Sequence, residues 1–344
     1  MELSNRKKII LSEIVKAHIA HGEPVGSKFL SQTAGLGVSS ATLRNEMSEL
    51  CEMGYLEQPH TSAGRVPTAA GYRMYVNGLL DNTNLSPPMQ ASIDRAIEKV
   101  SGDPENITAS AGQVLSELTG FATAIMTIPE DNAFIKRVEL LPMGKRMALM
   151  VLVTSDGVAR SRICRTGEVL TATAIKVFDR IVAVDIVGKE LNDFGGAVLQ
   201  TIAAKMGDQV LTLMPLITTL FEMIEVVRSS ELNLKGEANL YSAYQKDGDA
   251  RRLVEFITRR DALLSILSEV PDPVSVIFGD DCGIEELKPS SMVVAKFGGG
   301  ENRMGRIGII GPTRMAYEDL IPSITYFAKQ LGKILEQSVR DLDD

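Results

Sequence analysis

The sequence predicts a multidomain α+β protein: an N-terminal winged helix-turn-helix, followed by an α+β domain that a second domain interrupts. Three observations support this fold class. Residues 22–75 give a helix, a tight turn, a second helix and a short hairpin. Residues 134–164 give three strand-like runs at hairpin spacing, and three apolar helical stretches follow them. After Arg228, short strands and helices return, which indicates that one domain is split around an insertion.

Length and composition limit the class of protein. A chain of 344 residues exceeds one ordinary core, and 44% hydrophobic with 23% charged residues is typical of soluble globular proteins. The longest apolar run, residues 147–153, is too short to span a bilayer, and the N-terminus does not read as a signal peptide. Cys51, Cys164 and Cys282 are scattered and form no CxxC pair. This pattern favours a cytoplasmic protein without membrane contact, disulfides or a zinc site.

The first two helices of the predicted winged helix-turn-helix lie at residues 4–21 and 26–34. The second helix opens at Gly26, Ser27 and Lys28. It ends in the turn 35–37, where two glycines within three residues supply the sharp bend before the next helix.

The third helix is the predicted recognition helix. An apolar stripe of Leu43, Met47 and Leu50 fixes its buried face, and Ser39 is a good N-cap. Its outward side then carries short or donor-rich side chains in the first turns. Such positions contact base edges in the major groove, where Arg can pair with guanine and Asn with adenine. Arg44 and Asn45 are therefore the expected base readers.

A short hairpin, the predicted wing, follows the recognition helix. Residues 55–58 form a strand that must turn at Pro59, because proline cannot continue a ladder. The chain returns through Arg65 to Pro67, and Thr68 caps a last helix. The loop presents donors for phosphate or the minor groove, and Arg65 is expected at its tip.

The candidate DNA contacts combine these elements. They are Lys8, Lys28, Ser39, Ser40, Thr42, Arg44, Asn45, His60, Thr61, Ser62 and Arg65. Arg6, Lys7 and Arg73 complete the set of cations expected near phosphate. A helix-turn-helix also occurs in enzymes and adaptors, and a single arginine is often a solvated charge. The joint placement of helix and wing favours double-stranded DNA as the partner.

The net charge of −8 is distributed unevenly. Residues 1–80 contain eight Lys or Arg and seven Asp or Glu, a net of +1, and the rest contains 28 and 37, a net of −9. The acidity therefore lies outside the predicted reading head. Because a net of +1 is a weak electrostatic footprint, we expect affinity to depend on a few placed cations and on dimerisation.

Four motifs of this region are GEPVGSK, VSSATLRNEM, GYLEQPHTSAGRVPT and GYRMYV. Together they resemble the N-terminal domain of the HrcA family of bacterial heat-inducible transcription repressors. The resemblance implies a homodimer that binds an inverted-repeat operator, a CIRCE-type element, upstream of chaperone operons. It also implies a GAF-like domain split by an inserted dimerising domain, and a chaperonin that helps the repressor reach its active fold.

The expected domain boundaries follow from composition and element order, with the domain names taken from the resemblance. The winged helix-turn-helix covers residues 1–80, and a polar, proline-ended linker covers residues 81–88. The GAF-like domain is expected at residues 89–131 and 230–344, and the inserted dimerising domain at residues 132–229.

The elements expected after the linker alternate between helices and strands. Up to the end of the insertion they are helices 89–100 and 105–118, strands 122–128, 134–141, 146–153 and 158–164, and helices 172–184, 189–206 and 209–227. Beyond it they are a strand at 232–240, a helix at 249–267, strands at 274–278, 292–297 and 306–310, and a helix at 317–339. The three apolar helices of the insertion exceed what one small sheet needs for cover, which favours a self-association surface.

Two other functions stay open at this stage. A GAF-like pocket would make the protein a metabolite-responsive regulator, whose thermal midpoint shifts with ligand. An enzyme is disfavoured, because no Ser/His/Asp, Cys/His or HExxH set is available and all three histidines lie in the first 60 residues. The glycine run 298–300 and the acids between residues 280 and 286 are interpreted as a flexible hairpin and a solvated loop. We therefore expect no cofactor and no metal.

Overall fold

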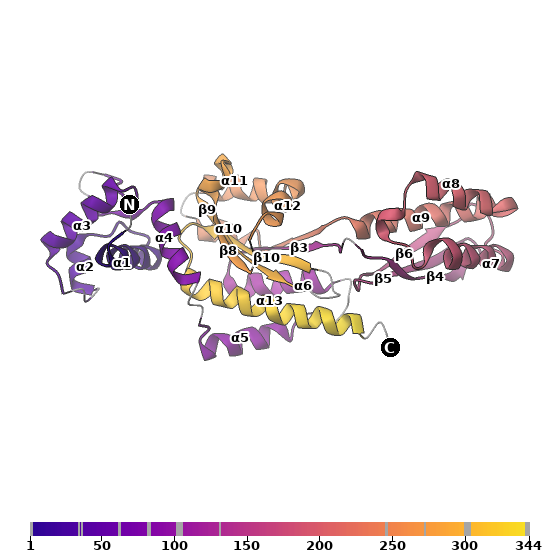
Figure 1. The fold of residues 1–344 in the computed structure, drawn as a ribbon, viewed down its shortest axis with the longest axis horizontal. Helices are drawn as coiled ribbons and strands as arrows, with labels where there is room; N and C mark the ends of the chain where they lie inside the picture. Colours follow the sequence, from indigo (N-terminus) through magenta and orange to yellow (C-terminus); the bar gives the residue numbers. More distant parts are fainter. Residues whose placement is uncertain are drawn as a thin grey trace.

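The computed structural model describes residues 3–33, 35, 37–60, 63–80, 84–100, 106–130, 132–244, 247–271, 273–298 and 304–340. Its parts follow one another along the long axis of an elongated molecule (Figure 1). The N-terminal helices lie at one end, a five-stranded sheet lies in the middle, and a three-stranded sheet with its helices lies at the opposite end. The last helix returns the chain to the middle.

The N-terminal unit, which we call the reading head, has the predicted winged helix-turn-helix order. Its elements are α1 (Asn5–His21), α2 (Ser27–Thr33), α3 (Ser40–Glu52), β1 (Leu56–Glu57), β2 (Val66–Pro67) and α4 (Ala69–Leu80). The apolar stripes of the helices meet in one core, where Ile14, Leu43 and Leu50 are fully buried. This burial fixes which side of α3 faces outward.

The middle unit, which we call the core domain, is built on one antiparallel sheet with the order β7-β3-β10-β9-β8. Its strands are β3 (Ala122–Ile128), β7 (Glu231–Lys235), β8 (Val274–Phe278), β9 (Ser290–Phe297) and β10 (Met304–Pro312). Its helices are α5 (Pro87–Ile97), α6 (Ile107–Thr119), α10 (Asn239–Ala243), α11 (Asp247–Ile257), α12 (Arg260–Ser268) and α13 (Tyr317–Arg340). Strand β3 precedes the insertion, β7 follows it, and the two strands pair directly. The split α+β domain is therefore confirmed.

Packed helices cover both faces of this sheet. On one face, Ile125 and Ile307 are buried in a cluster that includes Phe327 of α13 and extends into the reading head. On the other face, Val294 is buried in a cluster with Leu267 of α12. One hydrophobic core thus runs from the reading head through the core domain, so the two units pack directly against each other.

The unit at the far end, which we call the insert, combines one antiparallel sheet in the order β4-β5-β6 with three helices. Its elements are β4 (Ile135–Gly144), β5 (Met147–Thr154), β6 (Ala159–Arg165), α7 (Ala172–Ile181), α8 (Gly196–Lys205) and α9 (Val210–Arg228). Alternate residues of β5, namely Ala148, Met150 and Leu152, are fully buried on one side of the sheet. The three-stranded sheet predicted from the hairpin spacing is confirmed.

Helix α9 is the most apolar element of the insert. Together with the turn before it, residues Gly207–Arg228, it is long and apolar enough to cross a membrane by length and composition. However, Leu213, Leu216, Leu220 and Ile224 are fully buried in the core of the insert. Packing inside the protein therefore accounts for its hydrophobicity.

Three sequence predictions for individual elements are wrong in part. The helix expected at 189–206 begins only at Gly196, because Gly195 before it is extended (φ −137°, ψ −176°) and residues Leu191–Asp193 form a short 3-10 turn. The strand expected at 232–240 ends at Lys235, because Gly236 adopts a left-handed conformation with φ 72°. The helix expected at 249–267 is divided at Arg259, whose ψ of 92° is not helical.

Candidate nucleic-acid interface

The entry to α3 is held by a network of hydroxyl groups. The Ser39 hydroxyl accepts a hydrogen bond from the Thr42 backbone N–H at 3.1 Å, which is the predicted N-cap. The Ser39 and Thr42 hydroxyls are also 2.9 Å apart. A second pair, the hydroxyls of Ser27 on α2 and Ser40 on α3, is 3.0 Å apart and links the two helices across the turn. The start of the recognition helix is therefore fixed relative to α2 before any DNA binds.

The exposed side of α3 presents the two expected base readers. Arg44 and Asn45 are exposed, while Leu43 beside them is fully buried. Within the described part of the chain, the side chains of Arg44 and Asn45 form neither a hydrogen bond nor an ion pair. Both side chains are therefore free to extend toward base edges at the outermost end of the molecule, where Figure 1 places α3.

Two carboxylates of α3, Glu46 and Glu49, form ion pairs within the head. The Lys7 ammonium lies 2.9 Å from a Glu46 carboxylate oxygen and 2.8 Å from one of Glu49. These hydrogen bonds, first that with Glu49 and then that with Glu46, raise the pKa of Lys7. Arg6 also approaches Glu46, at 4.0 Å. Lys7 thus pairs with the acids of α3, and its contact with phosphate stays a prediction. Lys8 is exposed.

The wing differs from expectation at Arg65. Its backbone N–H donates to the Val25 carbonyl and its carbonyl accepts from the Val25 N–H, both at 2.9 Å. Arg65 therefore lies at the base of the wing, partly buried, and the expected place at the tip is wrong. Gly64 allows this close pairing, because a Cβ atom there would lie 2.4 Å from the Val25 carbonyl oxygen.

The other predicted wing contacts are His60, Thr61 and Ser62. His60 is exposed, and Thr61 and Ser62 lie outside the described residues. Lys28 is exposed near the start of α2. The reading head thus offers side chains from α1, α2, α3 and the wing, and DNA contact by each of them stays a prediction.

Arg73 of α4 faces the core domain, so its expected role as a phosphate contact is wrong. Its Nε donates to an Asp281 carboxylate oxygen at 3.2 Å, and a second guanidinium nitrogen donates to the other oxygen. The guanidinium also lies 6.0 Å from the centre of the Phe278 ring. The acids near residue 280, expected as a solvated loop, therefore include a carboxylate that anchors the reading head.

Further contacts seat the head on the core domain, and sequence reasoning missed all of them. The Tyr75 hydroxyl donates to Glu318 at 2.9 Å, and the Lys16 ammonium lies 3.1 Å from the same carboxylate. Tyr72 of the head packs against Tyr317 of the core domain, with ring centres 6.3 Å apart. Because these partners are more than 200 residues apart in sequence, local patterns give no signal for them.

Known proteins resemble this chain over nearly its whole length. A family model described as the HrcA protein C terminal domain matches residues 105–321. The heat-inducible transcription repressor HrcA of Acetivibrio thermocellus is 31% identical over 344 residues, which cover 98% of each chain. That of Moorella thermoacetica is 32% identical and covers 99% of this chain and 100% of its own. A crystal structure of a hypothetical protein shares the fold, with a TM-score of 0.69 at 23% identity over 98% of this chain and all of the other.

Proposed function

Because the chain belongs to the HrcA family of heat-inducible transcription repressors, we propose that it represses chaperone operons in the cytoplasm by binding operator DNA through its reading head. One observation carries the proposal. The capped helix α3 exposes Arg44 and Asn45, without partners in the described chain, at the free end of the molecule. The wing and Lys28 lie beside it as positioning contacts. The protein acts by occupying DNA and not by catalysis.

The operator is proposed to be an inverted repeat, read by two heads of a homodimer. One head with a net charge of +1 makes too few contacts to find a single site in a genome, whereas two heads multiply their discrimination. Selection of bound duplexes from a random pool by the purified full-length protein tests this directly. We expect an inverted repeat of the CIRCE type. Recovery of unrelated sequences, or of one isolated half-site, would contradict it.

The dimer contact is proposed on the open face of the insert sheet. Leu141 of β4, Leu149 of β5 and Ile163 of β6 lie side by side across the three strands. Leu141 is 49% exposed and Ile163 is 57% exposed, although Ala148, Met150 and Leu152 on the opposite side of β5 are fully buried. A sheet face of this kind is an association surface in many proteins. It lies at the end of the molecule opposite the reading head (Figure 1).

A charge placed on this face tests the dimer. We expect Ile163→Glu to convert the dimer to a monomer in sedimentation experiments and to lose inverted-repeat binding. Leu211→Glu is the matched control, because Leu211 is 68% exposed on α9 of the same unit but lies off the sheet. A dimer that persists in Ile163→Glu, or one that dissociates equally in both variants, would place the contact elsewhere.

Chaperonin availability is proposed to control the amount of active repressor. The core domain closes its sheet by pairing β3 with β7, which are separated by the whole insert. Such non-local pairing forms slowly and exposes apolar strands meanwhile. We expect a mild heat pulse to abolish operator binding, and chaperonin with ATP to restore it. Full recovery without chaperonin would instead indicate a directly reversible thermosensor.

A further inference from the structure

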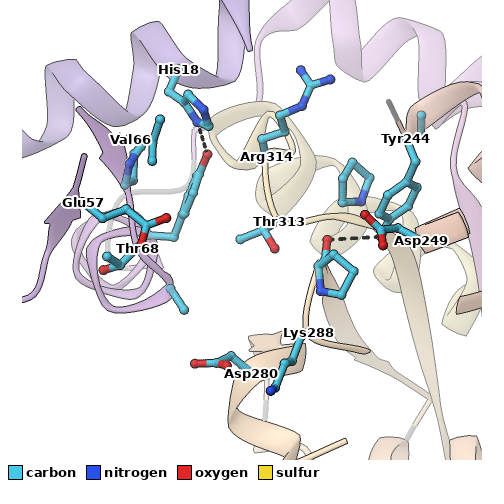
Figure 2. Close-up of a pocket in the computed structure, with 16 residues that line it drawn as sticks. His18, Glu57, Val66, Thr68, Tyr244, Asp249, Asp280, Lys288, Thr313 and Arg314 are labelled. Carbon is cyan, nitrogen blue, oxygen red and sulfur yellow. Dashed lines mark hydrogen bonds between the residues drawn. The ribbon is translucent and has the colours of Figure 1, made fainter. Parts of the chain in front are cut away.

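A cleft of about 550 Å³ lies between the reading head and the core domain (Figure 2). The head contributes His18 of α1 and the base of the wing, including Glu57 and Thr68. The core domain contributes the loop before α13 and the segment that follows α10. The size falls within the range of small-molecule sites, which often lie between two units of a protein.

The two ends of the cleft carry different charges. Arg314, on its upper rim in Figure 2, is partly buried and has no ion pair or side-chain hydrogen bond within the described part of the chain. Its charge lowers the pKa of His18, after the larger effect of burial. Asp249 and Asp280 line the side away from His18. The cleft thus offers a cation at one end and hydrogen-bond acceptors at the other.

The remaining lining suits an organic ligand. Tyr72 and Tyr244 supply aromatic surface, and both hydroxyls already have partners inside the protein. The hydroxyl of Thr313, next to Arg314, has no partner within the described residues and points into the cleft in Figure 2. Lys288, by contrast, lies 2.6 Å from Glu285, so its charge is already balanced. The Arg314 guanidinium is therefore the group that suits an anion, whereas the Thr313 hydroxyl points away from that guanidinium in Figure 2 and suits a second polar group of the ligand.

We propose that this cleft binds a phosphate monoester of a sugar or nucleoside, with the phosphate on Arg314 and the hydroxyl groups on Thr313, Asp249 and Asp280. A bound ligand touches both the reading head and the core domain, so it stabilises the seated head shown here. Operator affinity then changes with ligand concentration, because the two sites bias the same arrangement. By linkage, operator DNA changes ligand affinity by the same factor, in the range of about 5-fold to 150-fold.

Calorimetric titration of the full-length protein without DNA tests the site. The probes are adenosine monophosphate and ribose 5-phosphate, and adenosine is the control that lacks the phosphate. Replacing Arg314 by Ala or by Gln should weaken the phosphate probes about 10-fold to 150-fold, the value of one charge-assisted contact. Arg95→Ala on α5 is the matched control, since Arg95 is an exposed arginine outside this cleft.

Three results would overturn the assignment. One is the failure of both phosphate probes to saturate the protein at millimolar concentration. Another is equal binding by wild type, Arg314→Ala and Arg314→Gln, with folding verified by circular dichroism. Binding without any change in operator affinity, measured by fluorescence anisotropy, would remove the coupling. Because the titrations need no DNA, failure of this site leaves the proposed repressor function intact, and loss of operator binding leaves the site testable.

Discussion

Replacement of Arg44 by Ala separates base reading from stability. Arg44 is exposed on α3 and has no partner in the described part of the chain. Its removal leaves no buried group unsatisfied and no cavity, so the free energy of unfolding should change by less than about 0.5 kcal/mol. Any loss of operator binding then reports on DNA contact and not on folding.

The expected loss of operator affinity depends on the number of reading heads that contact the DNA. A bidentate arginine contact with guanine is worth about 1 to 3 kcal/mol of discrimination. In the proposed homodimer both heads carry the substitution, so we expect the loss to double to about 2 to 6 kcal/mol, which corresponds to about 30-fold to 20,000-fold in affinity. The variant should also tolerate base changes at the contacted position that the wild type rejects.

The assay is fluorescence anisotropy at one salt concentration, with the selected inverted repeat and with a duplex changed at one base pair of each half-site. Lys28→Ala is the matched control, because Lys28 is an exposed cation of α2 near the same surface. This control should weaken both duplexes equally and reduce the salt dependence. Wild-type affinity and selectivity in Arg44→Ala, or an equal loss on both duplexes, would refute the assignment of α3.

Three further predictions concern the reading head and its contact with the core domain. Gly64→Ala should lower the free energy of unfolding by about 1 to 3 kcal/mol, because its Cβ would lie 2.4 Å from a backbone carbonyl oxygen. Gly78→Ala should not lower the free energy of unfolding in this way, because the space around Gly78 is open. Equal effects of the two substitutions in chemical denaturation would exclude the steric clash at Gly64 as the cause. Burial and Arg314 lower the pKa of His18, so the unfolded chain binds the proton first and stability should fall as pH drops below about 6.5. His18→Gln should reduce the fall of the thermal midpoint with decreasing pH. An unchanged slope of thermal midpoint against pH would contradict this role of His18. In a double-mutant cycle, Arg73→Ala and Asp281→Ala should couple by about 0.5 kcal/mol or more, whereas strict additivity would mean that their contact does not seat the head.

Local sequence patterns were sufficient where an element is strongly periodic and its ends are marked. Strands β3 and β8 have the bounds expected from the sequence, and α3 begins at Ser40 directly after its predicted cap, Ser39. The split sheet was also predictable, since the return of short strands after residue 228 requires the chain to rejoin the domain that it left.

The expectations that failed depend on contacts between residues far apart in sequence. Arg65 was expected at the tip of the wing but pairs with Val25, which belongs to the segment between α1 and α2. Arg73 pairs with Asp281 of the core domain, which lies 208 residues away in the sequence. Lys7 of α1 pairs with Glu46 and Glu49 of α3, two helices later in the chain. A cation count along the chain cannot distinguish a charge that is free from one that is already paired, because pairing is decided by tertiary packing.

This pairing changes how the reading head must find its operator. Of the eight Lys and Arg in residues 1–80, three form ion pairs at 3.2 Å or closer, which leaves 8 − 3 = 5 for phosphate. The remaining five are Arg6, Lys8, Lys28, Arg44 and Arg65. With so few cations, each head holds nonspecific DNA weakly. Weak nonspecific binding favours release from wrong sites, so we expect occupancy of the operator to depend on base contacts made by the two heads of the proposed dimer. If the insert joins two heads as proposed, it contributes to specificity from the opposite end of the molecule, away from the DNA.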